Sequence, residues 1–288
     1  MSVIAANNLR KRYRDVHALD GLSFNVEPGQ ITGLIGPNGS GKTTAINAIL
    51  GLNTLDSGEL SVLGMNPATQ RAQLMTQVAY IADTGILPKW MKVKDMLDFV
   101  GRVQPTFNRE VAEAHLAKTD IRANKTIQTL SKGMHVQLHL AVVLAIDAPL
   151  LVLDEPTLGL DVLYRQRFYD AILNDYFTTE RSILVTTHEV REIEHILTNV
   201  VLIDRGRGAL VMDMQDAGTR YLKLTCGENV QLPAHPVSKR KSLQGTEYIF
   251  DGVPRELLEP LGPVSKPNLV ELFVAVVGDA SANGVAGE

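Results

Sequence analysis

Nine residues decide the fold of this chain: Gly36-Pro37-Asn38-Gly39-Ser40-Gly41-Lys42-Thr43-Thr44. They fit the phosphate-binding pattern GxxxxGK[ST] at every specified position. The residues just before them, 31–35, suit a buried parallel strand, and residues 43–50 read as a helix that opens directly after the loop. A glycine-rich turn alone has no such context, so the order of strand, loop and helix predicts a polyphosphate-binding site.

Each part of this loop has a physical reason to bind phosphate. Glycines let the backbone wrap a polyphosphate without Cβ clashes, and the start of the new helix offers inward-pointing N–H groups and a positive dipole end. Lys42 adds a full charge for the β- and γ-phosphates, and the hydroxyl of Thr43 suits Mg²⁺. The loop therefore predicts a nucleoside triphosphate with Mg²⁺ as ligand.

The composition limits the other possibilities. A chain of 288 residues with 45% apolar residues has room for one large or two modest globular domains. The formal net charge of −4 gives no reason to expect nucleic acid as a partner. Cys226 is the single cysteine, which suits a reducing compartment, and the first residues show no secretory signal. The most apolar stretch, 138–153, is interrupted by Asp147 and Pro149, so we expect no membrane-spanning helix.

The pattern of elements around the loop predicts an α/β fold with a mostly parallel sheet, the core of a P-loop NTPase. Residues 3–26 alternate loosely between apolar and polar, which predicts an N-terminal antiparallel β subdomain. Strands alternating with helices then imply a parallel sheet covered on both faces. The strands expected in that sheet are residues 31–35, 77–82, 150–153, 182–186 and 200–204.

An α-helical subdomain is expected as an insertion at about residues 88–148. Apolar residues recur there at helical spacing, and we interpret them as core: Val93, Met96, Leu97, Val100 and Val103. The whole nucleotide-binding domain is expected to cover residues 1–212, and a small α+β C-terminal extension to cover residues 213–288.

The expected extension carries two recognisable features. Asn268 with Glu271 three residues later predicts a capped helix, which we expect to stop at Gly278. The basic triplet Lys239-Arg240-Lys241 is expected in a loop, either solvated or in contact with anionic lipid headgroups.

Further residues with chemical potential lie outside the loop. Asp154 and Glu155 end an apolar strand, where the first is placed to hold Mg²⁺ and the second to polarise a water for in-line attack on the γ-phosphate. His188 follows the next expected strand. Tyr13, ahead of the phosphate loop, is open to two interpretations, an aromatic that stacks on a nucleotide base or a half-buried strand tyrosine.

A further segment, Leu130-Ser131-Lys132-Gly133-Met134, lies upstream of the strand that ends in the two acids. Together with the phosphate loop, the two acids and His188, it makes residues 1 to about 210 resemble the nucleotide-binding subunit of ATP-binding cassette (ABC) transporters. The segment looks like a variant of the family's signature LSGGQ. By this resemblance Ser131 and Gly133 approach the γ-phosphate of the ATP held by the opposite subunit. Lys132 and Met134 depart from the signature, although similar variants occur in the exporter branch of the family.

The resemblance also implies roles for other residues. Tyr13 becomes the base-stacking aromatic, residues 158–161 the loop that crosses the dimer interface, and His188 the switch histidine that contacts the γ-phosphate. Glu155 and His188 are then the catalytic residues of an ATPase. The Mg²⁺ ligands by the same resemblance are Thr43, Asp154 and Asp83.

Asp83 is the more serious departure, because the family usually has a glutamine at this position. An acid there adds negative charge near Asp154 and Glu155, which repels unless a metal is present. We therefore expect a tighter Mg²⁺ dependence or an altered coupling to the transmembrane partner.

The resemblance further implies partners and a place in the cell. The chain looks most similar to bacterial exporter subunits, which pair with a separate transmembrane permease and lie peripherally on the cytoplasmic face of the inner membrane. A second nucleotide-binding subunit is required, and we expect an identical copy, giving a homodimer with no nucleic acid bound. Two alternatives stay open: a soluble ABC ATPase that assembles or remodels a macromolecular complex, and a regulator that binds ATP without hydrolysing it. Glu155 argues against the regulator.

Overall fold

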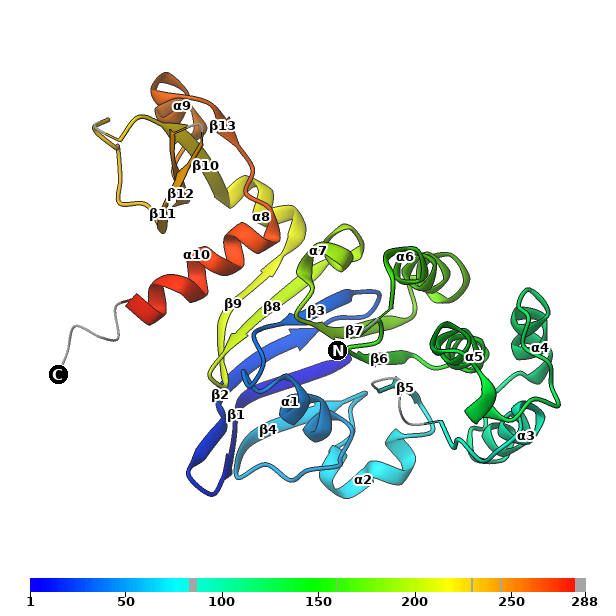
Figure 1. Cartoon of the computed structure of the whole chain (residues 1–288). Coiled ribbons are helices and arrows are strands. Elements are labelled where there is room, and N and C mark those ends of the chain that lie inside the picture. The colour runs from blue at the N-terminus through cyan, green and yellow to red at the C-terminus, as the bar shows by residue number, and fades with distance from the viewer. Residues whose placement is uncertain (83–86, 159, 229, 244, 283–288) are drawn as a thin grey trace.

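The computed structural model describes residues 1–82, 87–158, 160–228, 230–243 and 245–282. Three sheets organise these residues: a central sheet with helices on both sides, an antiparallel sheet beside it, and a separate sheet near the C-terminus (Figure 1). The class expected from the sequence, an α/β fold with a P-loop core, is confirmed.

The central sheet has the order β5-β6-β7-β3-β8-β9. Its first five strands run parallel, and β9 runs antiparallel to β8 at the edge. Sequence reasoning missed β9, because it took the glycines around Gly206 as the end of the core pattern; they form a tight turn with positive φ at Arg205 and Gly206. The strands are β3 (Ile31–Ile35), β5 (Val78–Ile81), β6 (Leu150–Asp154), β7 (Ser182–Thr187), β8 (Asn199–Asp204) and β9 (Arg207–Asp213).

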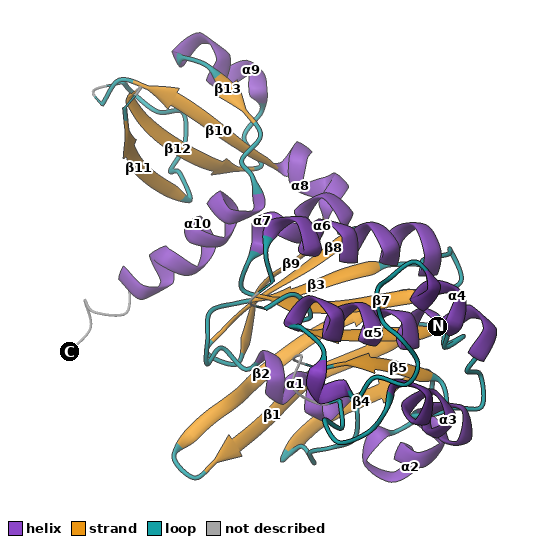
Figure 2. Cartoon of the chain, turned by 45° about the vertical axis from the view of Figure 1, so that its right-hand side comes forward, coloured by secondary structure: helices purple, strands orange, loops and turns teal. Residues whose placement is uncertain are grey.

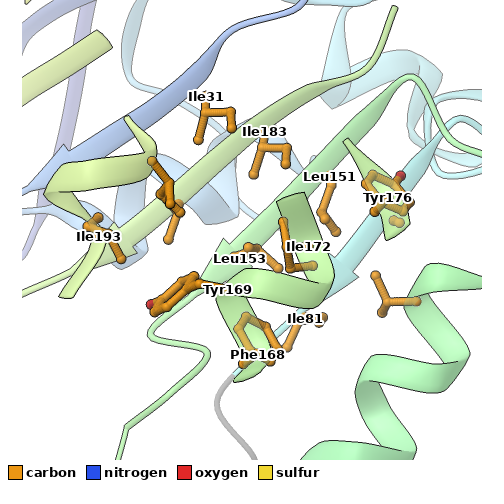
Figure 3. Close-up of a cluster of buried hydrophobic side chains, with 14 of the residues drawn as sticks. Ile31, Ile81, Leu151, Leu153, Phe168, Tyr169, Ile172, Tyr176, Ile183 and Ile193 are labelled. Carbon is orange, nitrogen blue, oxygen red and sulfur yellow. The ribbon is translucent and has the colours of Figure 1, made fainter. Parts of the chain in front are cut away.

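Successive residues of these strands point to opposite faces, and each face has its own core. Leu151 and Leu153 pack on one face with the aromatic residues Phe168 and Tyr169, as Figure 3 shows. Leu150 and Val152 pack on the other face, toward α1 (Lys42–Ile49) and the antiparallel sheet. The helical elements covering the first face are α5 (Lys132–Leu144), α6 (Val162–Ala171), the π-helical turn η2 (Ile172–Tyr176) and α7 (Val190–Ile193), followed by the 3-10 turn η3 (Glu194–Ile196).

The antiparallel sheet has the order β2-β1-β4. It is built from β1 (Ile4–Tyr13), β2 (Val16–Val26) and β4 (Ser57–Val62), followed by α2 (Pro67–Leu74). The antiparallel strands expected within residues 3–26 are thus confirmed.

The helical lobe lies at the far edge of the central sheet (Figure 2). It contains α3 (Val93–Val103), α4 (Arg109–Ala117) and the 3-10 turn η1 (Ile127–Thr129), and α5 packs against α3 and α4. Of the five residues expected in its core, four are buried. Val103 is 58% exposed, so that expectation was wrong; it is the last residue of α3, and the buried face of that helix ends before it at Val100.

A C-terminal unit, which we define as residues 221–282, forms a sheet of order β11-β12-β10-β13 and connects to β9 through α8 (Met214–Arg220). One face of its sheet packs on α9 (Arg255–Leu258), and the opposite face on α10 (Leu269–Ala282). The remaining elements are β10 (Tyr221–Cys226), β11 (Ser238–Ser242), β12 (Gly245–Asp251), the 3-10 turn η4 (Glu259–Leu261) and β13 (Val264–Ser265).

Two expectations for this unit were wrong and one is confirmed. The triplet Lys239-Arg240-Lys241 lies in strand β11 and not in a loop, because it pairs antiparallel with β12. Helix α10 continues past Gly278 to Ala282, since one interior glycine costs a helix only about 1 kcal/mol. The predicted cap exists: Glu271 N donates to Asn268 Oδ1, and Asn268 N donates to Glu271 Oε2, both at 2.9 Å.

Among the described residues, no helix combines the length and the apolar character that crossing a membrane requires.

Candidate functional site

The phosphate loop connects β3 to α1 and is wedged between two other strands. A Cβ on Gly36 would lie 2.2 Å from the carbonyl oxygen of Ile203, and a Cβ on Gly41 would lie 2.4 Å from that of Ala18. Gly41 also has φ of 111°, a conformation that favours glycine. The loop backbone therefore fits against its neighbours only with glycine at both positions. The loop residues exposed to solvent are Pro37, Asn38, Gly39 and Thr43.

Lys42 curls back over its own loop. Its side chain is 7% exposed, and its Nζ donates to the carbonyl oxygens of Gly36 at 2.8 Å and Pro37 at 3.2 Å. The same Nζ lies 3.7 Å from Glu155 Oε1, which makes a partly buried ion pair. The loop lysine and the expected catalytic acid thus share one site.

The site offers two side-chain oxygen donors for Mg²⁺, from Thr43 and Asp154. Thr43 is the second residue of α1 and is exposed, next to the half-buried Thr44, and Asp154 ends β6. Ser40 Oγ in the loop is buried and has no hydrogen-bond partner among the described residues. No three His, Cys, Asp or Glu side chains of the described residues are close enough to hold a metal by themselves. Magnesium usually takes one or two protein oxygens together with substrate phosphates, so this donor set fits it.

Thr186, near the end of β7, forms hydrogen bonds with both acids at the end of β6, Asp154 and Glu155. Its Oγ1 donates to Asp154 Oδ1 at 2.6 Å, and its Oγ1 and carbonyl oxygen accept from the backbone N of Glu155 at 3.2 and 3.1 Å. Glu155 has φ of 48°, which is uncommon outside glycine and is found where surrounding structure imposes it. The two strands therefore fix both the carboxylate of Asp154 and the turn that aims Glu155.

His188 meets Glu155 although 33 residues separate them in the chain. Its Nδ1 lies 2.9 Å from Glu155 Oε2, and its Nε2 lies 3.9 Å from Glu189 Oε1. The reason is topological: β6 and β7 are neighbouring parallel strands, so the residues after them emerge at the same edge of the sheet. The site thus brings together Lys42, Asp154, Glu155 and His188, as the sequence led us to expect.

A half-buried tyrosine lies beside this edge. Burial, and secondarily the charge of Asp154, raise the pKa of Tyr80 to about 12. Tyr80 therefore stays protonated at neutral pH and adds no charge to the acidic edge.

Tyr13 is the last residue of β1, which belongs to the antiparallel sheet and not to the central sheet. It is 43% exposed, its hydroxyl accepts from Asn53 Nδ2 at 2.6 Å, and Lys11 Nζ lies 5.5 Å from its ring centre. The structure thus places Tyr13 in a strand with somewhat more than half of its surface covered, and both interpretations stay open. An exposed ring of this kind offers a face for stacking, and base stacking stays a prediction.

The signature segment begins α5. Ser131 is the N-cap residue, and its Oγ accepts from Met134 N at 3.3 Å. A Cβ on Gly133 would lie 3.1 Å from the ring of Tyr164 in α6, so a larger residue there would require the ring to shift by a few tenths of an ångström. In the described parts of the chain, no hydrogen bond or ion pair joins this segment to the phosphate loop. Its action on the ATP of a second subunit stays a prediction.

The expected interface loop is only partly described. Leu158 is 42% exposed, Leu160 is buried, and Asp161 caps α6 by accepting from Tyr164 N at 3.0 Å. Gly159 and the unusual Asp83 lie outside the described residues.

Sequence reasoning missed two parts of the site. Thr186 reads as an ordinary β-branched strand residue, so nothing local marks it. Arg165 and Glu192, which form an ion pair between α6 and α7, read as solvated helix charges. Only the short distances between these side chains and their partners in the folded chain reveal either role.

A hollow of about 900 Å³ on the described surface lies elsewhere. It covers the outer face of the antiparallel sheet, lined by residues such as Asn7, Asn25 and Glu59. Its volume would suit a ligand, but the side chains that can bind phosphate and activate water lie at the phosphate loop and not in this hollow. A loop that wraps phosphate, with a lysine, two acids and a histidine at one sheet edge, defines the class of P-loop nucleoside triphosphatases.

Comparison with known proteins narrows this class. Residues 19–158 match the ABC transporter family. The chain is 35% identical over 212 residues to the Nod factor export ATP-binding protein I of Cupriavidus metallidurans, covering 72% of this chain and 69% of that protein. It is 34% identical over 297 residues to the protein of the same name from Sinorhizobium fredii, covering 96% and 86%.

Solved structures agree. An ATP-binding subunit of an ABC transporter superposes with a TM-score of 0.67 at 25% identity, covering 75% of this chain and 92% of that one. An ATP-binding cassette dimer in a post-hydrolysis state with ADP and Pi has the same fold, with a TM-score of 0.62 at 18% identity, covering 73% and 98%. The chain belongs to the ABC transporter family, as an ATP-binding subunit with ATPase activity.

Proposed function

We propose that this chain hydrolyses ATP to power export of a substrate through a separate transmembrane permease. The observation that carries the proposal is its resemblance along 96% of its length to a protein named for export. That resemblance includes the C-terminal residues, which the ABC family match at 19–158 does not cover. The alternative, a soluble ATPase that remodels a macromolecular complex, has no comparable support.

In the proposed reaction, the phosphate loop and Lys42 bind the phosphates of ATP. Glu155 accepts a proton from the attacking water, which becomes the nucleophile at the γ-phosphate. His188 orients Glu155 through the contact between Nδ1 and Oε2 and contacts the γ-phosphate with its other nitrogen. Tyr13 stacks on the base.

We propose that Thr43 and Asp154 hold Mg²⁺, with Asp83 as a further ligand. When bound, the metal neutralises charge on the phosphate oxygens. Thr186 holds the Asp154 carboxylate in place for this role through its 2.6 Å hydrogen bond. The Asp83 part of the proposal predicts that Asp83→Gln changes the Mg²⁺ dependence or the transport-coupled ATPase rate, and unchanged values of both would remove it.

A second copy of the chain completes the site in this proposal. Ser131 and Gly133 of one copy contact the ATP held by the other, which explains why the two residues make no polar contact with their own phosphate loop. Support comes from Val162 and Leu163, which are 77% and 69% exposed directly after Asp161 of the expected interface loop. Contact with a second copy would cover these two apolar side chains.

The helical lobe is the proposed docking site for the permease. Trp90 and Phe99 expose 77% and 50% of their surface there, close in sequence to Asp83. A permease surface docked on this lobe would cover these two apolar side chains. Rigid-body motion of the two copies on ATP hydrolysis would move the permease subunits resting on this lobe.

We further propose that residues 1–212 are the nucleotide-binding domain, with the helical subdomain at about 88–148, and that residues 213–288 are an accessory extension. The separate cluster of buried residues around Leu224 and Phe250 supports such a division.

The test uses the variant Glu155→Gln, which should bind ATP but not hydrolyse it. Tagged protein is recovered with Mg·ATP from detergent-solubilised membranes of the host cell, and copurifying proteins are identified by mass spectrometry. The matched control carries Lys42→Ala in addition, which should abolish ATP binding. A membrane protein with several apolar spans, recovered in equal amount and only by Glu155→Gln, supports the proposal. Recovery of soluble partners alone, with the chain absent from membranes, would overturn it.

A further inference from the structure

The segment that follows His188 is held at two points by carboxylates. It comprises α7 and η3, and its apolar side chains Val190 and Ile193 pack into the core, where Figure 3 shows Ile193. Its glutamates Glu192 and Glu194 point to different parts of the molecule.

Glu192 provides the first anchor. Its Oε1 pairs with Nη1 of Arg165 in α6, and Arg165 Nε also donates to the carbonyl oxygen of Leu160 at 2.7 Å. Leu160 lies five residues after Glu155 in the same segment. This anchor therefore ties the segment after His188 to the segment after Glu155.

Glu194 provides the second anchor, which reaches the C-terminal unit. Its Oε1 accepts from the backbone N of Leu269, the first residue of α10, at 2.8 Å. The carboxylate thus meets the N-terminal end of a helix, where a negative charge is favourable. Leu269 and Leu272 are each 1% exposed and belong to the same core cluster as Ile193. Both Figure 1 and Figure 2 show α10 starting close to α7.

Helix α10 is in turn fixed to the C-terminal sheet. Glu271 Oε1 accepts from Lys223 Nζ of β10 at 2.7 Å, and both side chains are mostly buried. A displacement of the sheet is therefore passed to the first turn of α10, and from there to Glu194.

We infer that Glu194 is a positioning residue for ATP hydrolysis. Through it the first turn of α10 holds the segment that carries His188 against Glu155, so the C-terminal unit sets the turnover rate. This inference rests on the proposed role of His188 and adds a role for residues beyond the nucleotide-binding domain.

The test measures kcat and KM for Mg·ATP on the full chain. Glu194→Ala should lower kcat about three- to ten-fold, as expected for partial loss of a charged hydrogen bond. KM should stay unchanged, because the phosphate loop is untouched. Glu194→Gln should keep most of the rate, since its amide oxygen can accept from Leu269 N. The matched control is Glu180→Ala, an exposed glutamate that makes no hydrogen bond or ion pair among the described residues; it should leave both constants unchanged.

A double-mutant cycle separates the outcomes. In a His188→Ala background, Glu194→Ala should lower kcat no further, and an equal fall in both backgrounds would overturn the inference. If His188→Ala alone leaves kcat unchanged, the proposed role of His188 fails instead. Thermal unfolding shows whether Glu194→Ala folds. If it does not, Lys223→Gln is measured in its place, since it removes the ion pair between β10 and α10. A kcat that is about two-fold lower supports the inference, and an unchanged kcat overturns it.

Discussion

Thr186→Val removes a single hydroxyl from the site while keeping the shape of the side chain. Thr186 is fully buried, and its Oγ1 serves both acids, as donor to Asp154 Oδ1 and acceptor from Glu155 N. Valine fills the same space but can do neither. We expect the variant to lose stability and catalytic rate together.

The structure gives the size of the effect. A hydrogen bond to a charged group contributes about 1.5–3 kcal/mol, and the bond from Glu155 N is shared with the Thr186 carbonyl, so its loss adds little. The free energy of unfolding should therefore fall by about 2–3 kcal/mol. At roughly 2–4 °C per kcal/mol for a domain of this size, Tm should fall by about 4–12 °C. The kcat should fall about ten-fold, because Asp154 and Glu155 both lose their fixed positions.

Thr32→Val is the matched control. Thr32 lies on β3, next to β7, and is also fully buried, but its Oγ1 has no hydrogen-bond partner among the described residues. Removing an unsatisfied hydroxyl should leave stability unchanged or raise it by about 1 kcal/mol. Urea unfolding followed by circular dichroism, with steady-state ATPase rates, measures both variants. Equal losses of stability in the two variants would refute the reasoning, since burial alone would then explain them.

Three further predictions follow from burial and backbone geometry. Desolvation first, and then the nearby His135, lower the pKa of His139 from 6.5 to about 4. Between these two pH values the unfolded chain therefore binds more protons than the folded one, so the contribution of His139 to stability should be complete above pH 6.5 and be lost as the pH falls toward 4. In His139→Gln, the urea midpoint should decrease less between pH 6.5 and pH 4 than in the unchanged chain. Both Gly41 and Gly39 have positive φ, where alanine is strained, but a Cβ on Gly41 would also lie 2.4 Å from the carbonyl oxygen of Ala18, whereas a Cβ on Gly39 meets nothing within 4 Å. Gly41→Ala should therefore weaken ATP binding in calorimetric titration at least about ten-fold more than Gly39→Ala. Leu272→Ala should lower the free energy of unfolding by about 2–5 kcal/mol in urea titration, and a loss below 1 kcal/mol would contradict its place in the core.

The part of the site that the sequence made predictable depends on short-range patterns and one rule of topology. The phosphate loop is a contiguous motif, so its strand, turn and helix can be read directly. Asp154 ends β6 and His188 directly follows β7, the next strand of the parallel sheet, and the carboxyl ends of such strands meet at one edge. The histidine itself was expected from the resemblance to the family, and this rule explains why it lies beside the acids.

The remainder depends on contacts between distant segments. The hydroxyl of Thr186 and the ion pair of Arg165 with Glu192 are made by residue types that are common on any strand or helix, so no spacing marks them. Strand β11 was read as a loop because three consecutive cations suggest solvent, while its pairing with β12 overrides that local preference. The roles of Tyr13, Ser131 and Gly133 stay predictions, since they concern a nucleotide or a second subunit.

Strand β11 also bears on how copies of this chain behave when crowded together. It is the outermost strand of the C-terminal sheet, hydrogen-bonded to β12 on one side, and such an edge exposes backbone groups that can recruit a strand from another molecule. Its Lys239, Arg240 and Lys241 are all exposed. Lys241 is paired with Glu228 at 2.8 Å, so a second copy approaching edge to edge would chiefly bring the charges of Lys239 and Arg240 beside their counterparts, at the spacing of neighbouring strands, where like charges repel. The edge is therefore protected against aggregation by its own side chains.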